Sequence, residues 1–329
     1  MRDKSTENNR KGINLNVHMA NSLPRIIILV VIAAALSLIS PFFLTTNNIM
    51  NVIAMSSVPA IFAFAQMLVV LTGNIDLSLG AIMSISSVIS ALLIKFTGVP
   101  IPLAIIAGFI VGGFFGFING LLISKVKLPS FIATYGLQIA ITGFAIAILK
   151  GYVVYGYPEE FRFVGVGRWG NIPVIIFAML VVFGIMWVVL NRTTFGRRVY
   201  AIGANVDAAH MSGINVDRTI IVVYIIAGVL AACAGILQVA RFNAAQSSLG
   251  AALLLPSIAS VVIGGTSMFG GEGGAFGTVI GVLIMNVIQN GLNIIGAPSL
   301  LQQFIVGLII LFAVIVDQTV RNYSAKRLK

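Results

Sequence analysis

The sequence predicts an all-α membrane protein that crosses the bilayer about ten times, with some spans broken or re-entrant and one short helix in a cytoplasmic loop. Hydrophobic residues make up 59% of the 329 residues and charged residues only 9%, and the mean hydropathy is +1.06. A soluble domain of this length cannot bury so much apolar surface. Ten apolar segments also meet or approach the roughly twenty residues that a helical span needs.

These segments follow one another along the chain, separated by short polar connections. In order, they are Leu23–Ile39, Ile49–Thr72, Ala81–Phe96, Val99–Ser124, Leu128–Leu149, Ile172–Leu190, Thr219–Ala240, Ala251–Phe269, Ala275–Ile295 and Leu300–Val316. The third is only sixteen residues long, and the eighth is interrupted by Pro256 and runs into Gly264 and Gly265. Either of these two is therefore a candidate for a broken or re-entrant helix. The fourth is rich in glycine, which lets neighbouring helices approach closely.

Charge predicts the orientation of the spans. With the N-terminus inside and ten crossings, fifteen of the twenty lysine and arginine residues fall in segments on the inner side and five on the outer side. This bias places both termini in the cytoplasm. The predicted organisation is a cytoplasmic tail over 1–22, a transmembrane domain over 23–316 with a cytoplasmic loop at 191–218, and a second cytoplasmic tail over 317–329.

Composition excludes several classes of protein. A net charge of +11 would suggest nucleic-acid binding in a soluble chain, but orientation accounts for basic residues beside apolar spans, so no nucleic-acid partner is expected. The single cysteine, Cys233, leaves no intrachain disulfide and no cysteine-based metal cluster. The chain has no HExxH, GxSxG or P-loop motif, so we expect neither an enzyme nor ATP hydrolysis by this chain itself.

The loop Asn191–Arg218 is the longest hydrophilic stretch between two spans. Its middle, Asn205–Ser212, reads as a short helix opened by Asn205 and closed by Gly213. Two interpretations remain open at this point. The loop is either a connection kept in the cytoplasm by its arginines or a docking helix for a soluble partner.

Polar residues at the spans give the candidates for a translocation pathway. Asp76 lies in the glycine-broken stretch GNIDLSLG, where it or Ser78 either caps the third span or borders a water-filled path. Glu272, in GGEGG, reads more simply as a cytoplasmic turn. Uncharged polar side chains in the spans suit a hydroxylated solute or, equally, hydrogen bonds between helices. The pathway candidates are Gln66, Asp76, Ser78, Asn119, Gln289, Asn290 and Asn293.

Four patches carry a more specific signal: LTGNIDLSLGAIMSIS at Leu71–Ser86, TTFGRRVYAIGANVDAAHMSGINV at Thr193–Val216, SVVIGGTSMFGGEGGAFGTVIG at Ser260–Gly281 and QNGLNIIGAPS at Gln289–Ser299. Together with their order, their spacing and the number of spans, they resemble the monosaccharide-type permease subunits of bacterial ATP-binding-cassette (ABC) importers, the ribose, galactose and allose group. The resemblance covers nearly the whole chain.

The resemblance implies a permease dimer in the lipid of the bacterial cytoplasmic membrane, either homomeric or heteromeric. An extracytoplasmic sugar-binding protein would deliver the solute, and an ABC ATPase with two nucleotide-binding sites would drive transport. ATP and Mg²⁺ would then bind the ATPase, and this chain would hold no cofactor. The loop at 191–218 would contain the coupling helix. Its implied ATPase contacts are Ala201, Gly203, Asn205, Asp207, Ala208, Ala209, His210, Ser212 and Gly213.

Two departures from the family pattern bear on function. His210 stands where relatives usually carry an arginine, and Leu253–Ser260 lacks the acidic residues expected there. Two alternatives to a sugar permease remain. One is an ABC permease for another small polar solute, such as a nucleoside or a branched-chain amino acid. The other is an ion-coupled carrier acting alone, although such carriers usually place charged residues in mid-span.

Overall fold

The computed structural model describes residues 23–298, 300–302, 304–309, 311–312 and 315. Within these residues the chain is a bundle of helices with only four two-residue strands. The tails predicted over 1–22 and 317–329 lie outside the described residues. The all-α prediction is confirmed.

Seven of the described helices are long and apolar enough to cross a membrane. They are α2 (Thr46–Val70), α3 (Leu79–Phe96), α4 (Ile101–Ser124), α5 (Ser130–Leu149), α7 (Val174–Arg192), α10 (Val216–Phe242) and α12 (Ala275–Ile294). The other predicted spans correspond to shorter apolar helices, Leu23–Ile39, Ala251–Ile263 (α11) and Leu300–Ile309. The described residues therefore do not bear out ten full-length spans.

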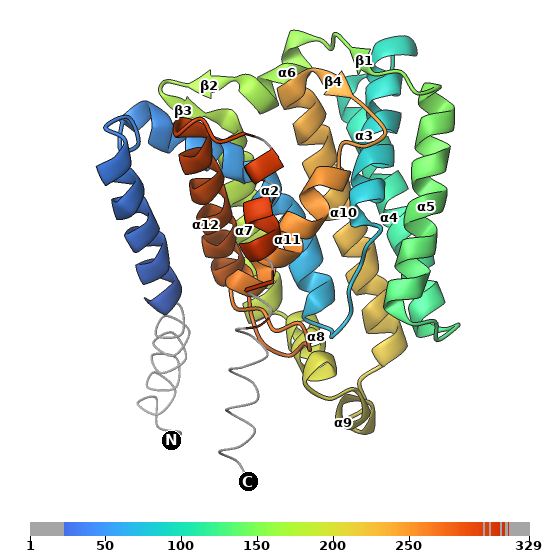
Figure 1. Ribbon diagram of the computed structural model, residues 1–329. Coiled ribbons are helices and arrows are strands. Elements are labelled where there is room, and N and C mark those ends of the chain that lie inside the picture. Colours follow the sequence, from blue (N-terminus) through green and yellow to red (C-terminus); the bar gives the residue numbers. More distant parts are fainter. Residues whose placement is uncertain (1–22, 299, 303, 310, 313–314, 316–329) are drawn as a thin grey trace, which may run out of the picture.

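The eighth predicted span differs most from the structure. It was expected to run over Ala251–Phe269, but α11 ends at Ile263 and is 13 residues long. Gly264 and Gly265 follow, and Gly265 has a φ of +80°, which only glycine adopts readily. At its other end, α11 begins inside the bundle, because the chain descends from β4 (Ala244–Ala245) before the helix starts (Figure 1).

Helices α2, α3 and α10 form the centre of the bundle. In the most apolar stretch of α2, 83% of the residues are buried, whereas the corresponding value for α5 is 28%. The side chains of Phe62 and Phe64 on α2 and of Tyr224 on α10 are fully buried. Helices α4, α5 and α7 thus present apolar side chains outward, as lipid-facing helices do.

Glycines bring α4 and α10 into backbone contact. A Cβ atom at Gly112 or Gly116 of α4 would overlap the carbonyl oxygen of Gly228 or Tyr224 of α10. The close approach expected from the glycine-rich fourth span is therefore present, and it fixes α4 against the central helix.

The two ends of the bundle differ. At one end lie α6 (Glu159–Val166), the antiparallel pair β1 (Val154–Tyr155) with β4, and the pair β2 (Arg168–Trp169) with β3 (Ile172–Pro173). At the other end lie α8 (Thr194–Ala204) and α9 (Val206–Met211) (Figure 1). The predicted coupling residues lie at this second end.

Candidate functional site

Helix α9 is the predicted short helix. The Asn205 side chain accepts a hydrogen bond of 2.9 Å from the Ala208 N–H, which caps the first turn. At the other end Gly213 has a φ of +79°, and the Ile214 N–H donates to the Ala209 carbonyl at 3.1 Å. Both boundaries inferred from the sequence are confirmed.

The surface of α9 is open. Ala209 is buried at 3% exposure. Six of the other predicted contact residues are exposed: Asn205, Asp207, Ala208, His210, Ser212 and Gly213. Met211, which the sequence analysis did not single out, is 87% exposed.

Helix α8 precedes α9 and was missed as a separate helix. Thr193 caps it by accepting from the Gly196 N–H at 3.1 Å, and Val199 and Ile202 are fully buried. The predicted contact residues Ala201 and Gly203 lie on α8 and are half-buried. Gly203 packs against the backbone of Leu71 and Gly271 in this same chain. Its neighbours are thus the chain's own loops.

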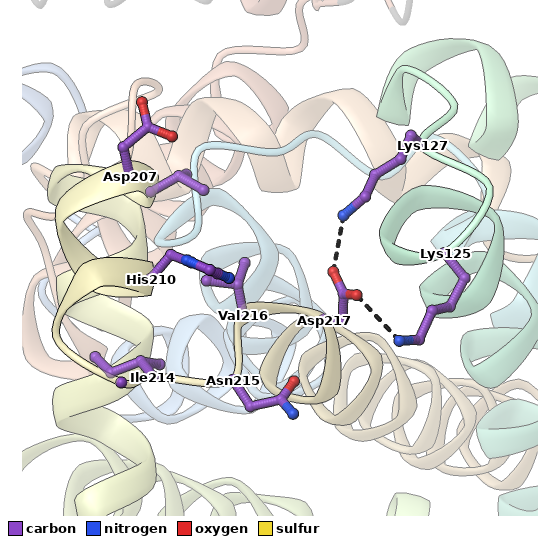
Figure 2. Close-up of a pocket in the computed structure, with 10 residues that line it drawn as sticks. Lys125, Lys127, Asp207, His210, Ile214, Asn215, Val216 and Asp217 are labelled. Carbon is purple, nitrogen blue, oxygen red and sulfur yellow. Dashed lines mark hydrogen bonds and ion pairs between the residues drawn. The ribbon is translucent and has the colours of Figure 1, made fainter.

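A cavity of about 560 Å³ lies beside α9 (Figure 2). Lys125 and Lys127, from the α4–α5 connection, donate to the Asp217 carboxylate at 3.1 and 2.8 Å. His210, the residue that departs from the family pattern, lines the same cavity. Both lysines are more than 60% exposed, so these ion pairs contribute less than about 1 kcal/mol each. They connect the start of α10 to the loop between α4 and α5.

Asp76, Ser78 and Asn119 are brought together in one buried cluster. Asp76 accepts from the Ser78 N–H and hydroxyl, both at 2.7 Å. The Asn119 side-chain amide donates to Ser78 at 2.7 Å and to Asp76 at 3.4 Å. All three side chains are fully buried. Asp76 therefore satisfies the amide of Ser78, the residue directly before α3.

The same cluster retains unused hydrogen-bonding capacity. In the described part of the chain, the Asn119 Oδ1 and the Tyr224 hydroxyl have no hydrogen-bond partner. Gln66 on α2 is also fully buried, and neither of its amide atoms is paired within the described residues. Buried polar atoms are nearly always paired. Asn119, Tyr224 and Gln66 are therefore buried polar side chains with hydrogen-bonding capacity that the described residues do not use.

The α12 candidates lie in different surroundings. Asn290 exchanges two side-chain hydrogen bonds of 3.0 Å with Asn48 at the start of α2. Gln289 and Asn293 are exposed, and Asn293 accepts from Gln302 at 2.9 Å. Among the described residues, no hydrogen bond joins these side chains to the Asp76 cluster. The pathway candidates thus form two separate groups.

Sequence reasoning missed several partners. Asn48 and Thr134 each pair with a residue far along the chain: Asn48 with Asn290, and Thr134 with Leu77, whose N–H donates to the Thr134 hydroxyl at 3.1 Å. The only sequence signal for Asn48 was its place in the polar stretch between the first two spans. No group of three or more histidine, cysteine or acidic side chains that could hold a metal ion occurs among the described residues.

The seven long apolar helices among the described residues define a multi-pass membrane protein. The family model described as branched-chain amino acid transport system / permease component matches residues 48–314. The chain belongs to this permease family.

Curated relatives agree with this assignment. The ribose import permease protein of Bacillus subtilis is 40% identical over 292 residues, covering 88% of this chain and 90% of the relative. The D-allose transport system permease protein of Escherichia coli is 39% identical, covering 89% and 90%. The fructose import permease protein of Rhizobium meliloti is 34% identical, covering 94% and 89%. No solved structure matches the chain significantly.

Proposed function

We propose that this chain is the membrane-spanning subunit of an ABC importer for a monosaccharide or a sugar-like solute. The observation that carries the proposal is the similarity to ribose, allose and fructose import permeases over about nine-tenths of the chain. In such a system the solute arrives from an extracytoplasmic binding protein. ATP and Mg²⁺ bind a separate ATPase with two nucleotide-binding sites.

The exposed face of α9 is the proposed contact with the ATPase. Its capping residue Asn205 and its closing residue Gly213 make it a preformed element, so docking orders little additional chain. Ala209 is buried and packs α9 against the rest of the chain. The proposed contact residues on α9 and its ends are Asn205, Asp207, Ala208, His210, Ser212 and Gly213. The proposal assigns α9 to the cytoplasmic side, in agreement with the charge bias.

Two copies of the permease subunit, or this chain and a related one, would enclose the pathway. Gln289 and Asn293 support this arrangement because they are exposed polar side chains on a spanning helix. Contact between such side chains and lipid is costly, so a water-filled path or a second subunit would cover them. Uncharged amides suit the hydroxyl groups of a sugar.

Purification from membranes in mild detergent tests the ATPase contact. One preparation carries the native chain, and a second replaces Val206–Ser212 with a glycine-serine linker of equal length. A third, the control, replaces the exposed Tyr152 at the opposite end of the bundle with serine. We expect an ABC ATPase to copurify with the first and third chains only. Equal recovery with all three would remove α9 from the contact, and recovery with none would favour a carrier that acts alone.

A branched-chain amino acid permease is the second candidate function, because the matching family model carries that description. Uptake into proteoliposomes that hold the complete transporter separates the two. Labelled ribose or allose entering in an ATP-dependent manner supports the sugar permease. Labelled leucine entering, with no sugar uptake, supports the amino acid permease instead.

A further inference from the structure

Three glycines from distant parts of the chain meet at the end of the bundle that carries α8. Gly73 belongs to the break between α2 and α3, Gly203 to α8, and Gly270 to the loop between α11 and α12. A Cβ atom at Gly270 would lie 2.7 Å from the Gly73 nitrogen and 2.9 Å from the Gly203 Cα. A Cβ at Gly203 would overlap the Leu71 carbonyl oxygen. No side chain separates these three backbones, and we call this contact the glycine junction.

Hydrogen bonds join the same three segments. The Gly271 N–H donates to the Leu71 carbonyl at 3.0 Å. The Tyr200 hydroxyl of α8 donates to the Gly273 carbonyl at 2.9 Å. Burial raises the pKa of Tyr200 to about 12, so this hydroxyl keeps its proton at physiological pH. Helix α8 is thus bonded to the loop that leads into α12, and that loop is bonded to the end of α2.

Hydrogen bonds also fix the end of the α2–α3 break that is next to α3. The Asp76 carboxylate is bound by Ser78 and Asn119, and the Leu77 N–H donates to Thr134 of α5. The stretch from Gly73 to Ser78 is therefore fixed to α8 on one side and to α4 and α5 on the other. Because these contacts join backbone to backbone, we expect a displacement of α8 to be passed on to α3.

We propose that the glycine junction transmits the movement of the ATPase-docking segment α8–α9 to the α2–α3 break and to the start of α12. The proposal rests on the proposed function, which supplies the ATPase. In this arrangement α9 receives the partner, whereas Tyr200 and Gly203 of α8 are positioning residues for coupling. These two residues act on the α2–α3 break and on the loop between α11 and α12, which lie beside the candidate pathway, and not on the ATPase.

Variants of the whole transporter test this. Gly203→Ala adds one methyl group at the junction, and Tyr200→Phe removes only the bond to Gly273. Gly184→Ala on α7 is the matched control, because nothing lies within 4 Å of the Cβ atom that it adds. Three quantities are measured for each variant in proteoliposomes: the amount of ATPase bound, the ATPase rate with and without the loaded binding protein, and the solute taken up per ATP hydrolysed.

We expect both junction variants to bind the ATPase normally and to hydrolyse ATP. We also expect uptake per ATP to fall by about fivefold or more, in the range typical of coupling between sites. Gly184→Ala should behave as the native chain does. A merely structural role would lower the yield of transporter but leave uptake per ATP unchanged, and that result would overturn the proposal. If the Gly203→Ala variant fails to assemble, the uptake per ATP hydrolysed by the Tyr200→Phe variant tests the proposal instead. Failure of the native chain to bind any ATPase would contradict the proposed function instead.

Discussion

Asn48 and Asn290 are 242 residues apart in the chain, and their side chains exchange two hydrogen bonds of 3.0 Å. The pair joins the first turn of α2 to the later part of α12. It gives Asn290 a structural contact in addition to the pathway role predicted for it. The Asn48 side chain also donates to the Phe43 carbonyl at 2.8 Å, so the pair fixes the turn that precedes α2.

A double-mutant cycle should measure this pair directly. Asn48→Leu and Asn290→Leu each remove both hydrogen bonds, and the doubly substituted chain leaves no amide unpaired. We expect a coupling energy of about 0.6 kcal/mol, the average for polar contacts between membrane helices. The measurement is the unfolding equilibrium of the purified protein in mixed micelles. Additive effects of the two substitutions would mean that the pair contributes nothing to stability.

Gln289→Leu and Asn293→Leu should lower solute uptake with little change in stability. Both side chains are exposed on α12, so their loss disturbs little of the packed interior. The matched control is Asn286→Leu, because the Asn286 amide donates to the Val282 carbonyl of its own helix at 3.0 Å. Uptake and ATPase recovery are measured for all three. Normal uptake by both test variants would take this face of α12 out of the pathway.

Asp76→Leu should destabilise the protein more than Asp76→Asn. The leucine leaves the Ser78 N–H and hydroxyl without their acceptor, at a cost of about 1–3 kcal/mol. The asparagine keeps a side-chain oxygen at the same place. The midpoint of thermal unfolding in detergent distinguishes the two, with the exposed Glu272→Leu as the control for loss of an acidic group. Equal midpoints for Asp76→Leu and the native chain would mean that the cap is not required.

Gly213→Val should disrupt the end of α9, whereas Gly213→Asn should be tolerated. Gly213 has a φ of +79°, and a β-branched residue is strained there, while asparagine adopts this conformation more readily. The strain costs about 1–2 kcal/mol and falls on the proposed docking element. We expect uptake to fall for valine and to persist for asparagine while both proteins insert normally. A valine variant that transports solute at the native rate would contradict the docking role of this turn.

Much of the fold follows from local sequence signals. Apolar runs located the spans, and Asn205 and Gly213 located both ends of α9, because capping depends on residues next to one another in the chain. The separate helix α8 and the contacts of Gly203 with Leu71 and Gly271 were not predicted. Helix α8 has a local signal in Thr193, which caps it, but the contacts of Gly203 depend on backbone segments far apart in the chain.

The candidate site divides in the same way. Asp76 and Ser78 were predicted together in one break and Asn119 separately within a span, and the structure places all three in one cluster. This grouping depends on tertiary structure, because Asn119 lies on α4, two elements after the break. The sequence placed the start of α11 at Ala251, where the helix does begin, but placed its end at Phe269 instead of Ile263. Pro256, Gly264 and Gly265 marked this span as weak without showing that the helix ends at the two glycines.

The backbone contact between α4 and α10 limits how this transporter can change shape. With Gly112 against Gly228 and Gly116 against Tyr224, the two helices cannot rotate about their axes or slide without their main chains colliding. We therefore expect α4 and α10 to move as one rigid body when the transporter opens. Movement that the glycine junction passes to the α2–α3 break would then reach both helices together, because Asn119 of α4 is bonded to Ser78 at the end of that break.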